Sequence, residues 1–105
     1  EDVKMVAKNF RMIADNASPM MRMYLKKARL SAGENNRLMI VLPDEVSAGF
    51  VARQEHKDEI VRLIEEKIGK TVIVEVRHVE EGRRFEDSFV DIEKVIHMDI
   101  TVEDF

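Results

Sequence analysis

Apolar residues recur at a helical period in the first part of the chain. Four of them follow one another at spacings of three and four, with charged residues between them: Val3, Val6, Phe10 and Ile13. This period places the four side chains on one face of a helix. We therefore expect an amphipathic helix over residues 3–15.

A second helix is predicted to begin just after Ser18. Proline fits the first helical position, and the Ser18 side chain can accept a hydrogen bond from the first turn. The helix is expected over residues 19–28. Its three closely spaced methionines suit either an irregular core or an adaptable binding surface, and core filling is favoured: Met20, Met21 and Met23.

Strand patterns follow. "ARLSAGENNRLMIVL" predicts a β-hairpin with strands over 29–32 and 37–42, joined by a loop rich in Gly and Asn. "TVIVEVRHV" alternates apolar and polar residues, which predicts a third strand over 71–79 with one buried face. The pattern shows no long parallel crossover between strands.

Three further helices are expected. A Pro-Asp-Glu run starts one over 44–52, and isoleucines at helical spacing that end at Gly69 predict another over 55–68. A capping-box relation that begins at Ser88 predicts the last, over 88–97. The fold class is therefore α+β: a small three-stranded sheet with helices packed on it, in a single domain over residues 1–105.

The strand over 37–42 raises a question because it has no polar face. If Leu38, Ile40 and Leu42 face the helices, the opposite side chains also need a cover. The C-terminal segment with its phenylalanines can fold over them, which is the favoured alternative. Otherwise they form an apolar patch for a partner, and the candidate partner-binding residues are then Met39, Val41 and Ile73.

Composition narrows the function classes. The chain has 105 residues, 45% of them hydrophobic and 36% charged, with no cysteine. These values are typical of a soluble domain without disulfides or a membrane span, so the cytoplasm is the expected location. The first residue is Glu1 rather than Met, which suggests a piece of a longer protein.

Candidate chemistry is sparse. The three histidines fall at no metal-ligand spacing, and no phosphate-binding loop or nucleophile motif is present. We expect no enzyme activity, no cofactor and no metal. A basic stripe at the end of the second predicted helix suits the helix dipole, or else a nucleic acid or acidic partner: Arg22, Lys26, Lys27 and Arg29.

The element order resembles a type II K-homology domain, a module that binds single-stranded nucleic acid, with an extra C-terminal helix. Such a domain has a G-x-x-G loop between its two central helices. The corresponding stretch here is "AGFVARQEHK", which holds only Gly49. Because both glycines are needed for close approach to phosphates, and because the net charge is −4, weak DNA binding or none is expected.

A second resemblance covers nearly the whole chain. "ASPMMRMYLKKARL", "NRLMIVLPDEVSAGFVARQEHKDEIVRLIEEKIGKTVIVEVR" and "FVDIEKVIHMDITVED" are similar to the C-terminal region of the gamma/tau clamp-loader subunit of bacterial DNA polymerase III. The resemblance implies a non-catalytic module that tethers replisome proteins, the polymerase alpha subunit among the candidates. The alternative is a K-homology-like module that binds single-stranded nucleic acid through the basic stripe.

Overall fold

A computed structural model describes residues 2–35, 37–80, 82–85 and 89. Helices α1 (Asp2–Asp15) and α2 (Pro19–Lys26) come first, followed by strands β1 (Arg29–Ala32) and β2 (Arg37–Leu42). Helices α3 (Glu45–Val51) and α4 (Gln54–Ile68) lead to strand β3 (Ile73–His78). The predicted α+β class is confirmed, and these elements agree with their predicted ranges to within two residues. The helix predicted over 88–97 lies outside the described residues, except for Phe89.

The three strands form one sheet in the order β1-β2-β3. β1 pairs with β2 in the antiparallel sense, whereas β2 pairs with β3 in the parallel sense. A parallel pair needs a long connection, and here α3 and α4 supply it. The expectation of no parallel crossover was therefore wrong: two helices in succession make the crossover.

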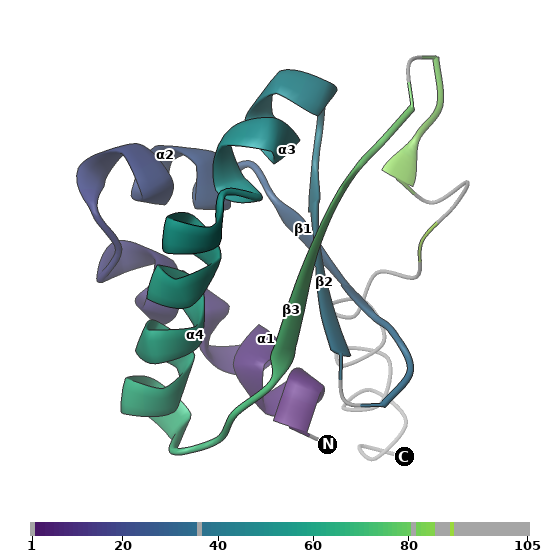
Figure 1. Cartoon of the computed structure of the whole chain (residues 1–105). Helices are drawn as coiled ribbons and strands as arrows, with labels where there is room; N and C mark the ends of the chain where they lie inside the picture. The colour runs from purple at the N-terminus through teal and green to yellow at the C-terminus, as the bar shows by residue number, and fades with distance from the viewer. Residues whose placement is uncertain (1, 36, 81, 86–88, 90–105) are drawn as a thin grey trace, which may run out of the picture.

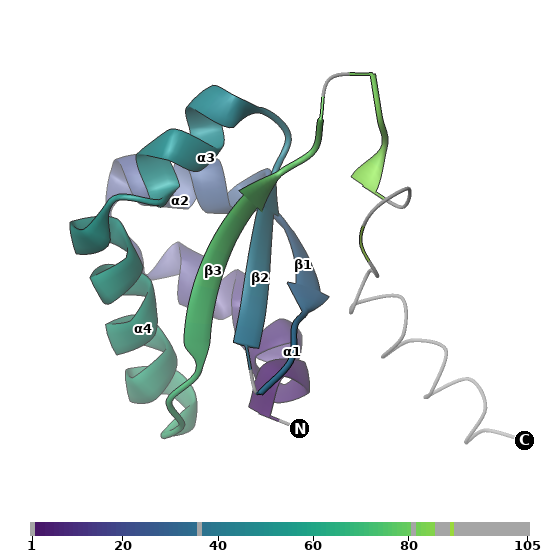
Figure 2. The ribbon, with the colours of Figure 1, turned by 45° about the vertical axis from the view of Figure 1, so that its right-hand side comes forward.

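The helices of the described chain pack on one face of the sheet (Figures 1 and 2). The core between these layers contains the α1 residues predicted from their period, together with alternate residues of the strands. Leu38, Ile40 and Leu42 are all fully buried in it. The face that β2 turns toward the helices is thus settled.

The start of α2 differs from its prediction. Ser18 is the N-cap residue, but its side chain accepts no capping hydrogen bond. Instead the Ser18 N–H donates to Glu59 Oε2 at 2.7 Å, and its hydroxyl lies 3.3 Å from Glu59 Oε1. A carboxylate of α4 therefore holds the first turn of α2 and joins two helices that are distant in sequence.

The start of α3 follows its prediction. Asp44 is the N-cap, and its carboxylate accepts a hydrogen bond from the Ser47 N–H at 2.7 Å. The Ser47 backbone N–H, then the Ser47 hydroxyl, lower the pKa of Asp44 below its usual range. Because the folded-state pKa lies below the unfolded one, this stabilisation is complete above the unfolded-state pKa. It is lost as the pH falls through the folded-state pKa.

We therefore expect Asp44→Asn to keep the helix cap, since the amide oxygen also accepts a hydrogen bond. The variant has no carboxyl group at position 44, so the cap no longer depends on pH. The variant should melt close to the wild type at about pH 7 and should lose less of its melting temperature on acidification to about pH 2. Asp44→Ala, which has no acceptor, should already melt lower at neutral pH. An equal acid-induced drop in the wild type and in Asp44→Asn would contradict the assignment.

Candidate interaction surface

The sheet face that points away from the helices is called here the second face. Its residues alternate along each strand with the core residues, and the strand register aligns them in rows across the sheet. They are Arg29 and Ser31 from β1, Arg37, Met39 and Val41 from β2, and Ile73, Glu75 and Arg77 from β3. Two of the three predicted contact residues, Met39 and Ile73, keep exposed surface here.

The Val41 end of the second face is closed. Val41 is only 1% exposed and Phe85 only 5%, and both lie outside the core cluster. The two side chains line the same cavity of about 280 Å³. The Arg29 guanidinium packs over the Phe85 ring at 4.6 Å from its centroid, and Phe89 stacks on Phe85 with the ring centroids 5.5 Å apart.

The position of Phe85 decides between the two alternatives for the Val41 end of the sheet, which were a cover by the C-terminal segment and an apolar patch open to a partner. Phe85 packs there, as the prediction of a C-terminal cover requires, so Val41 presents no surface to a partner. The prediction that groups Val41 with Met39 and Ile73 is thus corrected. Period-two alternation placed the three on one face, but burial on that face depends on a segment more than forty residues away.

The opposite end of the second face retains apolar surface. Ile73 is 54% exposed, and Met39 is half-buried. Glu75 lies between two arginines: Arg77 Nη2 is 3.3 Å from one carboxylate oxygen, and Arg37 Nη1 is 3.8 Å from the other. Two cations share one carboxylate, so a positive charge is left over beside Ile73.

A groove continues from this end around the outer edge of β3. It has a volume of about 250 Å³ and is lined by residues of β3, by Arg37 of β2, by Ala52 at the end of α3 and by Lys57 in α4. Figures 1 and 2 both show α4 beside β3, on the side away from β2. None of the ion pairs formed between described residues includes Lys57.

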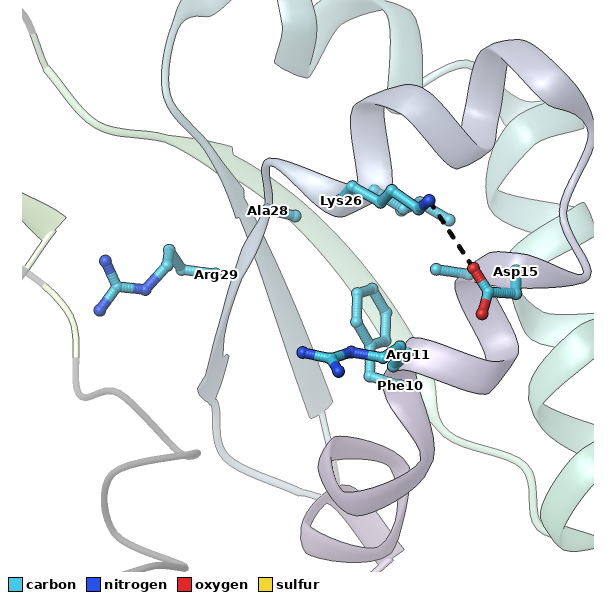
Figure 3. A pocket seen from close by; sticks show the side chains of 8 residues that line it. Phe10, Arg11, Asp15, Lys26, Ala28 and Arg29 are labelled. Atoms are coloured by element: carbon cyan, nitrogen blue, oxygen red, sulfur yellow. Dashed lines mark ion pairs between the residues drawn. The ribbon is translucent and has the colours of Figure 1, made fainter.

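The four residues of the predicted basic stripe lie in different environments. Lys26 lies 3.9 Å from Asp15 of α1, at a cavity of about 520 Å³ between α1, the end of α2 and β1 (Figure 3). Arg29 starts near the same cavity but points away from Lys26. Arg22 is half-buried on α2, and Lys27 is the exposed C-cap of that helix.

An aromatic stack at the junction of α2, α3 and α4 was not predicted. The Phe50 ring lies between Tyr24, at 4.6 Å, and His56, at 4.3 Å between centroids. His56 Nδ1 is 2.6 Å from the Phe50 carbonyl oxygen, and the Arg53 guanidinium is 5.7 Å from the Phe50 centroid. The three rings come from three helices, so no local period in the sequence could group them.

The stack lies beside the connection between α3 and α4, the position at which the resemblance to a K-homology domain would place a phosphate-binding loop. α3 ends at Val51 and α4 begins at Gln54, so only two residues connect them. Gly49 lies inside α3, where a Cβ would meet open space. The backbone at Gly49 therefore shows no close approach that demands glycine.

Other site types find no support in the part of the chain that the structure describes. It contains no group of three His, Cys, Asp or Glu residues placed to hold a metal ion. None of its helices has the length and apolar character needed to cross a membrane. No protein-family model matches the sequence. No curated protein matches it either.

Proposed function

We propose that this domain is a non-catalytic protein-interaction module of the DNA replication machinery. The observation that supports an interaction role is the exposed end of the second face. There a large aliphatic side chain, Ile73, stands next to the arginine pair on Glu75. Aliphatic surface bordered by arginines is typical of protein interfaces, in which arginine is enriched.

The placement in replication rests on the resemblance of the sequence to the clamp-loader gamma/tau subunit. In that setting the module tethers a replisome protein, with the polymerase alpha subunit as the first candidate. It supplies no chemistry and takes no cofactor. The dispersed basic stripe and the missing second glycine favour this function over nucleic-acid binding.

Capture of replisome proteins tests the proposal. The domain is immobilised, a bacterial extract is passed over it, and bound proteins are identified by mass spectrometry. We expect enrichment of polymerase subunits, and we expect Ile73→Asp to reduce that enrichment by about tenfold, which corresponds to about 1.4 kcal/mol of binding free energy.

Val46→Asp is the matched control, because Val46 is an exposed aliphatic residue, 81% accessible, on α3 rather than on the sheet. It should capture partners as the wild type does. The proposal fails if replisome proteins are not enriched. It also fails if the domain binds single-stranded DNA in a manner that survives about 200 mM salt, since contacts dominated by phosphates weaken steeply with salt.

A further inference from the structure

β3 is an edge strand of the sheet formed by the described residues, and its outer side is a row of backbone groups. Just after β3, the Val79 N–H donates to the Leu42 carbonyl of β2 at 3.1 Å. In a parallel pair, alternate residues direct both backbone groups to the neighbouring strand. The backbone N–H and C=O groups of residues 73, 75, 77 and 79 therefore point toward β2. Val74, Val76 and His78 direct their N–H and C=O groups outward.

The side chains at this edge favour an extended chain as the occupant. Val74 and Val76 face the helix layer and line the groove, together with Ala52 and Lys57. α4 lies beyond the edge of β3 (Figure 2), so the groove has a wall of helix on one side and a strand with outward backbone groups on the other. A strand added along this edge would direct alternate side chains toward the half-buried Val76, while Val74 belongs to the core.

The charges at the groove favour an acidic chain. Its lining contains two cationic side chains, Lys57 and Arg37, but only one carboxylate, that of Glu75. This carboxylate already contacts two arginines. The Nε atom of Arg37 is buried without a hydrogen-bond partner. Acidic side chains on an added strand would meet this surplus of positive charge.

We propose that the outer edge of β3 binds an extended acidic peptide segment of a partner protein, which adds to the sheet as a fourth strand. A second copy of this domain is a poorer occupant for two reasons. Its own β3, "IVEVRH", contains one glutamate and one arginine, so it brings no surplus of acidic side chains. Its α4 would also meet the α4 that already lies beside the edge. The inference rests on the proposed interaction function and names the chemistry of the bound segment.

A pair of defined peptides tests it. The probes are the acetylated, amidated octapeptides (Asp-Val)₄ and (Lys-Val)₄, titrated into the ¹⁵N-labelled domain and followed by amide chemical shifts. We expect the acidic peptide to shift the amides of Val74, Val76 and His78 and to bind at least about tenfold more tightly than the basic one. A third probe, the acidic peptide with alternate backbone nitrogens methylated, should not bind, because it cannot form the ladder.

A pair of variants tests the edge itself. Val76→Pro removes an outward N–H without removing a bond to β2, and edge strands accept proline at such positions. Val76→Pro should weaken binding of the acidic peptide at least about tenfold. Val76→Ala, which keeps the N–H, should weaken that binding much less. The amide chemical shifts of β2 report whether either variant disturbs the sheet. If one does, the methylated peptide still tests strand addition on the wild-type domain.

Three results would overturn the strand-addition proposal. One is equal binding of the acidic and basic peptides, another is binding of the methylated peptide, and the third is a concentration-dependent dimer that Val76→Pro dissociates. The two proposals fail separately. Replisome capture that Ile73→Asp abolishes but Val76→Pro leaves intact would retain the interaction function and reject the edge. Peptide binding without replisome capture would do the reverse.

Discussion

Replacing Val41 by aspartate is expected to lower the free energy of unfolding by at least about 3 kcal/mol, whereas Ile73→Asp should change it by less than about 1 kcal/mol. Both residues lie on the second face of the sheet, one strand apart. Val41 is 1% exposed and Ile73 is 54% exposed. A charge at position 41 would be buried without a partner, while a charge at position 73 reaches water and lies opposite Arg37 in the strand register.

The size of the Val41 effect matters because a domain of this length is stabilised by only about 5–15 kcal/mol. Urea denaturation of both variants at one temperature measures it. Val41→Ala is the control for lost volume: it should cost only about 1–2 kcal/mol, because it removes apolar contact and buries no charge. A Val41→Asp domain as stable as the wild type would mean that the Phe85 end of the second face is open to solvent.

The three methionines of α2 should separate sharply in a second series. Met21 is fully buried beside Leu25, whereas Met20 and Met23 are 52% and 47% exposed. Met21→Ala removes most of a core side chain and leaves a cavity, so we expect a loss of about 2–5 kcal/mol. Met20→Ala and Met23→Ala should stay within about 0.5 kcal/mol of the wild type.

Met21→Leu tests whether the loss comes from volume, because it keeps the side chain close to its original size. We expect it to retain most of the stability, with a cost below about 1.5 kcal/mol. Thermal melts and urea titrations of the four variants give the comparison. If Met20→Ala or Met23→Ala costs as much as Met21→Ala, the side of α2 that packs on the core has been assigned wrongly.

The methionines also show where sequence reasoning reached its limit. Their cluster suited a core or a surface, and the structure uses it for both: Met21 packs inside, and its neighbours lie outside. Helical geometry explains the division, since Met21 and Leu25 are four residues apart and share one face. The sequence predicted the helix, but only its packing against α1 and α3 selected the buried face.

Local signals determined most elements. A period of three to four residues predicted α1 and α4, the loop between 32 and 37 predicted the hairpin, and Gly69 marked the end of α4, where its φ is +70°. The Pro-Asp-Glu run predicted the start of α3, where Asp44 is the N-cap. Each of these features depends on residues within one or two turns of one another, so the sequence itself contains the cause.

Contacts between distant segments decided the rest. The parallel pairing of β2 with β3, the Ser18–Glu59 hydrogen bond and the stack of Tyr24, Phe50 and His56 each join elements that no period relates. The same holds for the second face, where Phe85 closes the Val41 end and leaves Ile73 exposed. A strand pattern specifies which side chains share a face, because backbone geometry alone sets that alternation. Which part of the face is covered is decided by packing free energy between segments far apart in the chain, so the candidate surface at Ile73 and the β3 groove emerged only from the tertiary structure.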